Sequence, residues 1–341
     1  MTGKSPRREE TSSRTVFGSV TEADLRNRFD ETDFVANDQL VTTTFLALRL
    51  ERPLLVEGPP GSGKTELGKV LAEGFDTELI RLQCYEGLTA ENALYEWNYT
   101  KQLLAVQSAE GTVEEPGDSV DTEASKRSVF DEAFLLERPL LRALTYDGDR
   151  PPVLLVDEVD RADAEFEAFL LEILSDFQVS IPELGTVSAR HPPVVVLTSN
   201  RTRGLSDALK RRCLYLHVEP PAFETEYEIV RRKVPELDAA VAAEVCAVAE
   251  RLRGEPFLKQ PGVAETLDWA RAVAALRADG TIAEVTPTVI ESTIGCLLKE
   301  AEDVNRVNID LLERLSEAAN EATRRVEAIP DGRTANADTE R

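Results

Sequence analysis

The sequence of 341 residues is strongly acidic: 63 aspartate and glutamate residues oppose 39 lysine and arginine residues, for a formal net charge of -24. Hydrophobic residues make up 42% of the chain, a share typical of a folded globular protein, which excludes a wholly disordered one. A uniformly acidic surface repels a phosphate backbone, so we do not expect DNA or RNA as the main partner. Length alone predicts about two domains.

The composition also argues against several kinds of site and segment. Cysteines and histidines are few and scattered, without a Cys-x-x-Cys pair or neighbouring ligands, which predicts reduced, buried thiols and no zinc site: Cys84, Cys213, Cys246, Cys296, His191 and His217. Residues 1–15 carry no apolar signal core, and no apolar run approaches the ~20 residues of a membrane span. We therefore expect a cytoplasmic protein without a membrane span. The scarcity of lysine among the basic residues fits either a halophilic origin or a GC-rich genome.

The N-terminal part of the chain leads into a phosphate-binding motif. Residues 1–15 are polar and predicted to be a disordered tail, and residues 21–50 have the periodicity of two helices joined near residues 34–37. Thr21 followed by Asp24 is a possible capping arrangement for the first helix.

Between an apolar strand at residues 52–56 and a helix at residues 66–73 lies the pattern G-x-x-x-x-G-K-[ST]. Its glycines allow backbone N–H groups to turn toward phosphate oxygens, and the following helix adds free N–H groups. We expect Lys64 to bind the β- and γ-phosphates and Thr65 to ligate Mg²⁺. The predicted nucleotide-binding residues are Gly58, Pro59, Pro60, Gly61, Ser62, Gly63, Lys64, Thr65 and Glu66, together with Asp157 farther along the chain.

The next part of the domain combines a second strand with an insertion. Residues 77–84 read as a strand, and the aromatic-rich residues 85–107 favour an inserted helix whose aromatic side chains pack internally, although a client-binding surface is the alternative. Residues 108–128 are acidic and poor in large apolar residues, which predicts a flexible surface insertion. A helical period returns over residues 130–144.

The apolar run at residues 153–156 ends in two carboxylates, Asp157 and Glu158. Open α/β sheets bind ligands at the carboxyl ends of their strands. We therefore expect Asp157 to hold Mg²⁺ through water, and Glu158 to polarise the attacking water. An acidic loop that follows a strand without any function is the alternative interpretation.

The rest of the sheet region contains two more candidate residues. Residues 163–174 predict an amphipathic helix, residues 177–189 a hairpin, and residues 193–200 a buried strand that ends at Asn200. Asn200 is a candidate for orienting the hydrolytic water beside Glu158. A short helix over residues 205–213 carries basic residues that could reach a phosphate on a neighbouring subunit, Arg212 first and Arg211 next.

After a last strand at residues 214–218 the pattern becomes entirely helical. Five helices are predicted, at residues 224–233, 238–252, 263–276, 287–298 and 305–327, before a polar tail at 328–341. The predicted fold class is α/β: a P-loop domain at residues 16–221 with a five-stranded parallel sheet, followed by a small all-helical lid domain at residues 222–327.

The order of these motifs resembles the AAA+ ATPases. The inserted segment and the hairpin before Asn200 resemble the MoxR branch, and residues 84–88 (CYEGL), 95–99 (YEWNY), 134–139 (FLLERP) and 261–266 (PGVAET) resemble its carbon-monoxide-dehydrogenase-maturation type. By this resemblance Lys64 and Thr65 are Walker A residues, Asp157 and Glu158 the Walker B pair, Asn200 is similar to sensor 1, and Arg212 looks like the trans-acting arginine finger. The family's usual sensor 2 arginine is missing from residues 262–266. Either Lys259 or Arg271 takes its place, or the lid senses nucleotide in another way.

The resemblance implies ATP and Mg²⁺ as cofactors and a homo-oligomeric ring, with six subunits expected. It also implies a separate von Willebrand factor A domain partner and a client metalloenzyme or other protein complex, matured or remodelled by a chaperone-like ATPase. Two alternatives come from other classes. A DNA-directed AAA+ loader is disfavoured by the acidic charge, and a non-hydrolysing nucleotide-dependent interaction module is disfavoured by the presence of Glu158, Asn200 and Arg212.

Overall fold

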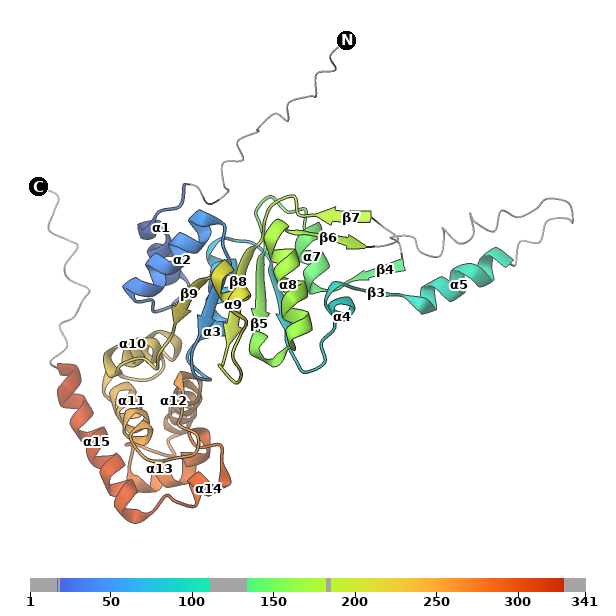
Figure 1. Cartoon of the computed structure of the whole chain (residues 1–341). Coiled ribbons are helices and arrows are strands. Elements are labelled where there is room, and N and C mark those ends of the chain that lie inside the picture. The colour runs from blue at the N-terminus through green and yellow to red at the C-terminus, as the bar shows by residue number, and fades with distance from the viewer. Residues whose placement is uncertain (1–16, 18, 111–133, 182–184, 328–341) are drawn as a thin grey trace, which may run out of the picture. The chain divides into compact units, whose positions relative to one another are not determined.

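A computed structural model describes residue 17 and residues 19–110, 134–181 and 185–327 (Figure 1). The contacts between residues divide the chain into two compact units. Unit 1 holds residues 36–57 and 65–217 with the described residues up to 28, and unit 2 holds residues 29–35, 58–64 and those from 218 onward. Each compact unit is therefore made of several segments that are separated in the sequence.

Unit 1 is built on a five-stranded parallel sheet, as predicted from the sequence (Figure 1). Its strands are β1 (Leu54–Glu57), β2 (Leu79–Gln83), β5 (Val153–Asp157), β8 (Val194–Ser199) and β9 (Leu214–His217), in the order β2-β5-β8-β1-β9. Every residue of β5 is buried, as is usual for a strand that has helices on both faces of its sheet. All five carboxyl ends therefore meet at one edge.

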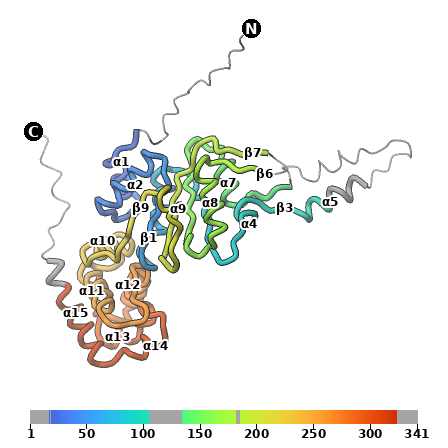
Figure 2. Tube along the Cα trace, in the orientation of Figure 1, coloured from blue at the N-terminus to red at the C-terminus, as the bar shows by residue number. Residues whose placement is uncertain are grey.

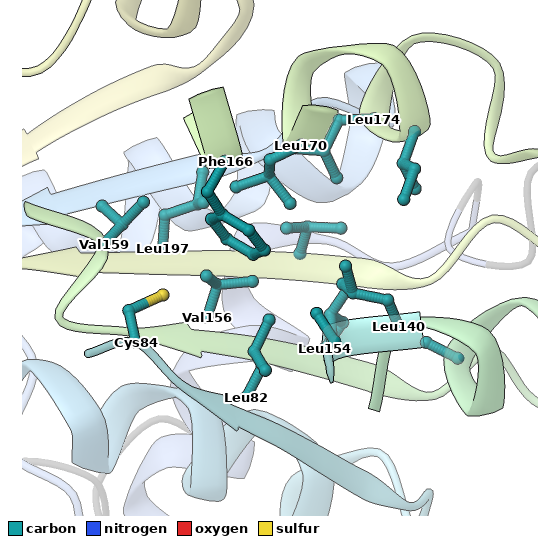
Figure 3. Close-up of a cluster of buried hydrophobic side chains, with 14 of the residues drawn as sticks. Leu82, Cys84, Leu140, Leu154, Val156, Val159, Phe166, Leu170, Leu174 and Leu197 are labelled. Atoms are coloured by element: carbon teal, nitrogen blue, oxygen red, sulfur yellow. The ribbon is translucent and has the colours of Figure 1, made fainter. Parts of the chain in front are cut away.

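Helices cover both faces of this sheet. Alternate residues of β5, Leu154 and Val156, join the core beneath α7 (Pro139–Thr145) and α8 (Ala164–Asp176), which Figure 3 shows around Phe166 and Leu170. On the opposite face α3 (Lys64–Gly74) lies so close that a side-chain carbon added to Gly68 would be 3.1 Å from Leu155. Side chains alternate between the two faces along a strand and recur on one face of a helix every third or fourth residue, and these two patterns determine which residues are packed on each face of the sheet.

The insertion after β2 differs from its prediction. One helix was expected over residues 85–107 and another over 130–144, but the chain forms α4 (Ala90–Leu94), β3 (Tyr95–Trp97), α5 (Tyr99–Glu110), β4 (Leu135–Glu137) and then α7. β3 and β4 pair antiparallel, with Trp97 opposite Leu135. Both strands have only three residues, too few for a period of two to be recognised.

The internal packing expected for the insertion's aromatic residues is only partly correct. Tyr95 packs against the core and its ring meets Trp97 edge to face at 5.9 Å, whereas Tyr85 and Tyr99 are exposed by 47% and 70%. Residues 108–110 of the predicted flexible insertion are helical, because α5 extends to Glu110. Residues 111–128 lie outside the described part of the chain.

The remaining elements of unit 1 agree with the sequence. α1 (Glu22–Glu31) begins at a reciprocal cap between Thr21 and Asp24, and α2 (Asp38–Leu50) is capped by Asn37. β6 (Gln178–Ile181) and β7 (Gly185–Ser188) form the predicted hairpin. Two short helices complete the unit, the 3-10 helix η2 (Val159–Arg161) and α9 (Asp207–Arg212).

Residues 218–327 of unit 2 contain helices as their only regular secondary structure, as predicted (Figure 2). Its elements are α10 (Phe223–Lys233), α11 (Ala239–Arg253), α12 (Val263–Ala278), α13 (Pro287–Thr293), η3 (Ile294–Cys296), α14 (Ala301–Val304) and α15 (Ile309–Glu327). The predicted helix 287–298 breaks at Thr293 into a 3-10 turn, and α14 was not expected. The core surrounds the fully buried Trp269 and a buried ion pair between Glu226 and Arg253. None of the helices described in either unit has the length and apolar character to cross a bilayer.

Candidate functional site

Asp157 occupies the carboxyl edge of the unit 1 sheet, at the end of β5. The residue is buried, and its Oδ1 accepts a hydrogen bond from the Thr65 hydroxyl at 3.0 Å. The Thr198 hydroxyl of the neighbouring strand β8 donates to the same oxygen at 2.5 Å. Thr65 lies in the first turn of α3, so the helix that follows the phosphate loop begins in contact with this carboxylate.

Glu158 follows directly and adopts a left-handed backbone conformation, with φ of 55°. Its backbone N–H donates to Thr198 Oγ1 at 2.9 Å, so a single hydroxyl positions both acidic residues. The Asn200 amide donates to Glu158 Oε1 at 3.3 Å, while Gln83 (3.0 Å) and Arg161 (3.1 Å) both donate to Oε2. A strained backbone held by several side chains is a common feature of functional sites.

The turn that carries Asn200 is held by Asp160, which is 2% exposed. The Asp160 carboxylate accepts from the Asn200 N–H at 3.2 Å, from the Thr202 N–H at 2.8 Å and from the Thr202 hydroxyl at 2.6 Å. Burial alone raises the pKa of Asp160, but the hydrogen bonds from Thr202 and Asn200 outweigh it and hold the pKa below its usual value. Between these residues Arg201 has φ of 59°, so the turn has a defined, sharply bent path.

Carboxylates at this edge influence the thiol of Cys84. Cys84 follows β2, and its N–H donates to the Asp157 carbonyl at 2.8 Å. Burial, followed by the charges of Asp157, Asp160 and Glu158, raises the pKa of the Cys84 thiol to about 12. Cys84 is therefore a neutral thiol at physiological pH.

The phosphate loop, residues 58–64, belongs to unit 2. The Lys64 ammonium is 7% exposed and donates to the carbonyls of Gly58 at 2.9 Å and Pro59 at 2.7 Å. Gly61 and Gly63 have φ of 76° and 84°, conformations that side chains rarely adopt. At Gly58 an added side-chain carbon would lie 2.2 Å from the Val218 carbonyl oxygen. The loop is thus a tight backbone structure closed around its own lysine.

The start of α12 packs directly on this loop. The Val263 N–H donates to the Gly61 carbonyl at 3.1 Å, and Glu265 caps the helix by accepting from the Gly262 N–H at 2.9 Å. A side-chain carbon added to Gly262 would come within 3.0 Å of the Gly61 Cα. A side chain at this position would require the loop to shift by a few tenths of an ångström, so glycine suits the second position of the 261–266 stretch.

The donor set around Asp157 fits Mg²⁺. Thr65 and Asp157 offer hard oxygen ligands next to each other, and Mg²⁺ is usually bound by one or two carboxylates, water and substrate phosphates. The described residues contain no group of three or more histidine, cysteine, aspartate or glutamate side chains able to cage a metal alone. A site of this kind would need phosphate oxygens to complete it.

Comparison with known proteins agrees with these motifs. Residues 53–213 match the AAA domain of the dynein-related subfamily. The match covers four of the five strands of the sheet (β1, β2, β5 and β8), the phosphate loop, the two carboxylates, Asn200 and Arg212. The fold is an AAA+ P-loop α/β fold followed by a helical region.

Individual relatives are distant. An uncharacterized protein of Staphylococcus aureus (strain bovine RF122 / ET3-1) is 27% identical over 177 residues, which are 50% of this chain and 56% of that protein. Chaperone protein ClpB 2 of Parasynechococcus marenigrum (strain WH8102) is 35% identical over 146 residues, 42% of this chain and 13% of ClpB 2. The chain thus spans about half, or much less, of these two relatives. The structure of the Thermotoga maritima RuvB Holliday junction branch migration motor has a TM-score of 0.45 and 19% identity, and covers 84% of this chain and 77% of its own.

The structure brings some of the predicted residues together but not all of them. Thr65, Asp157, Glu158 and Asn200 form one hydrogen-bonded group in unit 1. The Arg212 guanidinium, by contrast, donates to the Leu171 carbonyl and the Ser175 hydroxyl on α8. Glu66 pairs with Lys69 at 2.9 Å on the exposed side of α3.

The predicted substitutes for a sensor 2 arginine do not contact the phosphate loop among the described interactions. Arg271 pairs with Asp268 on α12 at 3.3 Å, and the Lys259 backbone N–H donates to the buried Asp303 carboxylate at 3.0 Å. The residues of α12 that do meet the loop are Val263 and its neighbours at the helix start.

Several residues of the site were not identified from the sequence: Arg81, Gln83, Asp160, Arg161 and Thr198. Gln83 and Thr198 lie at or next to the carboxyl end of a sheet strand and Asp160 and Arg161 follow one, whereas Arg81 lies in the middle of β2. Because those ends meet at one edge, every polar residue there was a candidate by the same argument that identified Asp157. Sequence alone does not show which of these side chains face one another.

Proposed function

We propose that this chain hydrolyses ATP and uses the energy to remodel a client protein. The observation that carries the proposal is the group at the carboxyl edge of β5, where Thr65 donates to Asp157 and Asn200 donates to Glu158. An AAA domain implies nucleotide hydrolysis in general. The phosphate loop supplies a backbone cradle, and its Lys64 is followed in the chain by Thr65.

In this proposal each residue has one role. Lys64 exchanges its two carbonyl partners for the β- and γ-phosphate oxygens, and Thr65 and Asp157 hold Mg²⁺, the latter through water. The metal, when bound, neutralises charge that develops on the phosphates. Glu158 accepts a proton from the attacking water, and the Asn200 amide orients its carboxylate. Three donors already contact the Glu158 carboxylate, which leaves room for one more, the water.

The mechanistic part of the proposal is tested by two variants. Lys64→Ala deletes the main positive charge at the phosphates and is expected to abolish binding of a fluorescent ATP analogue. Glu158→Gln keeps the site's shape but loses proton acceptance, so it binds the analogue normally while release of phosphate stops. Equal nucleotide affinity in Lys64→Ala and wild type, or turnover in Glu158→Gln at the wild-type rate, contradicts the assignment.

The biological role that we propose is that of a MoxR-type AAA+ ATPase that matures or inserts cofactors into a client metalloenzyme or other protein complex. The resemblance of residues 84–88, 95–99, 134–139 and 261–266 to the carbon-monoxide-dehydrogenase-maturation type supports this role, and similarity to a ClpB chaperone supports remodelling. We also propose a cytoplasmic homo-oligomeric ring, a hexamer, in which Arg212 serves the neighbour's site, and a separate von Willebrand factor A domain partner. Co-purification of the Glu158→Gln variant with that partner tests the role independently of the chemistry.

A further inference from the structure

Arg81, on β2, contacts the same carboxylate that the proposed function assigns to Mg²⁺. Its Nη2 atom lies 2.5 Å from Asp157 Oδ2 and 2.7 Å from Gln83 Oε1. The Arg81 side chain is 48% exposed, whereas the Asp157 side chain is 4% exposed. A solvent-facing cation therefore pairs with a buried anion.

The hydrogen bonds of Asp157 are divided between its two oxygens. Oδ1 accepts from the hydroxyls of Thr65 and Thr198, which are uncharged, and Oδ2 accepts from Arg81 alone among the described residues. A buried carboxylate is costly without a positive partner, and Glu158 and Asp160 nearby add to the cost. Arg81 thus supplies the positive charge at Asp157 in the structure as it stands.

We infer that Arg81 is a positioning residue and a built-in counter-ion that competes with Mg²⁺ for Asp157 and so sets the metal dependence of nucleotide binding. This inference rests on the proposed function. The ion pair is half exposed, so its net strength is modest and a divalent cation can displace it. Gln83 Oε1 gives the displaced guanidinium an alternative acceptor on the same strand. The metal thereby replaces a monovalent counter-ion without ever leaving the carboxylate unpaired.

The inference predicts two changes of opposite sign in Arg81→Gln. Without its competitor, Asp157 binds Mg²⁺ more readily. The Mg²⁺ concentration that gives half of the increase in fluorescent ADP binding is therefore about fivefold lower in the variant, the upper end for an exposed ion pair. Without metal, the bare carboxylate repels the diphosphate, so in excess EDTA the variant binds fluorescent ADP about fivefold more weakly than wild type. Arg81→Lys keeps the charge and is expected to lie between the variant and wild type in both measurements.

A lower Mg²⁺ requirement together with weaker ADP binding in EDTA distinguishes this role from a structural one, because a distorted site binds ADP more weakly both with and without Mg²⁺. The matched control is Arg142→Gln, which removes an arginine of similar exposure, 56%, from its ion pair with Glu78 beside β2 and is expected to change neither value. If wild type binds no fluorescent ADP at any Mg²⁺ concentration, the proposed function and this inference are both wrong. If wild type binds normally but Arg81→Gln has an unchanged or higher Mg²⁺ requirement, only the inference is wrong.

Discussion

Removal of the Asp160 carboxylate is expected to damage the turn that presents Asn200 to Glu158. The carboxylate is 2% exposed and accepts three hydrogen bonds, from the Asn200 N–H and from the N–H and hydroxyl of Thr202. Asp160→Ala leaves two backbone N–H groups without an acceptor. Asp160→Asn keeps one acceptor oxygen, but its amide then faces a backbone donor.

The magnitude follows from these contacts. A hydrogen bond to a charged group contributes about 1.5–3 kcal/mol, and a buried donor left unsatisfied costs about 1–3 kcal/mol. Since such terms are not additive, we expect Asp160→Ala to lower the free energy of unfolding of unit 1 by about 3–5 kcal/mol and Asp160→Asn by about half of that. For a unit of this size, the larger loss corresponds to a melting temperature about 10–20 °C lower.

Two measurements check this prediction. Thermal unfolding by circular dichroism gives the stability loss, and steady-state turnover with a separate nucleotide-binding titration gives the functional effect. We expect turnover to fall about ten- to a hundredfold, less than the ~10²–10³ for deleting a catalytic donor outright, because Asn200 is misplaced but still present. Nucleotide affinity is expected to change little, because the described hydrogen bonds of the Asp160 carboxylate all come from the turn at residues 200–202.

Acidification provides a further test with a defined sign. The folded-state pKa of Asp160 is below the ordinary value of 3.8, so its contribution is fully present above 3.8 and is lost as the pH falls through the lowered folded pKa. The difference in melting temperature between wild type and Asp160→Asn is therefore expected to narrow below pH 3.8.

A nearby aspartate serves as the control. Asp163→Ala removes a single capping bond, from the Phe166 N–H at 2.8 Å, and is expected to cost about 1 kcal/mol without changing turnover. Equal stability and turnover in Asp160→Ala and wild type would refute the reasoning. So would a loss of nucleotide affinity as large as the loss of turnover.

Two other predictions concern the proposed ring and the core of unit 2. Arg212→Ala is expected to lower turnover about a thousandfold while nucleotide still binds. Mixing this variant with Lys64→Ala is expected to restore partial activity, because some mixed interfaces combine an intact phosphate loop with an intact Arg212. Wild-type turnover in Arg212→Ala would instead assign the arginine finger to Arg211. Arg253→Met leaves the fully buried Glu226 without its cationic partner and is expected to lower the free energy of unfolding by about 3–5 kcal/mol, measured by chemical denaturation. The control Arg271→Met removes a half-exposed pair with Asp268 and is expected to lower it by less than about 1 kcal/mol, and equal losses in the two variants would contradict this prediction.

The sequence predicted best where one local pattern determines the structure. The buried run of β5 and the glycine-rich loop could be recognised because apolar runs and positive φ values depend on nearby residues alone. The amphipathic helix that became α8, capped by Asp163, was recognisable for the same reason. These local patterns were sufficient to predict the sheet, its ligand-binding edge and the carboxylates on it.

Features that depend on distant partners could not be predicted. β3 pairs with β4 across nearly forty residues, and neither strand is long enough to show an alternating pattern. Asp160 follows a strand and Thr198 lies within one, and in the sequence both resembled ordinary polar residues. Their roles depend on hydrogen bonds between residues about forty positions apart, from Thr198 to Asp157 and from the Asn200 N–H to Asp160. Arg81 was overlooked because an arginine within a strand usually points to solvent, and its partner lies 76 positions away.

The distribution of charge at the sheet edge reconciles a very acidic chain with the proposed binding of a triphosphate. Three arginines, Arg81, Arg161 and Arg201, pair with Asp157, Glu158 and Glu57, and each arginine is about half exposed or more while its partner is largely buried. Cations therefore lie on the solvent side of the edge and anions beneath them. A duplex contacts a protein at many phosphates over a wide surface, so the net charge of -24 leads us to expect no duplex as a partner. The nucleotide of the proposed function contacts a far smaller area. At this edge the arginines lie outermost and the inner carboxylates favour a divalent cation, so the charge that disfavours nucleic acid does not disfavour a magnesium-bound nucleotide.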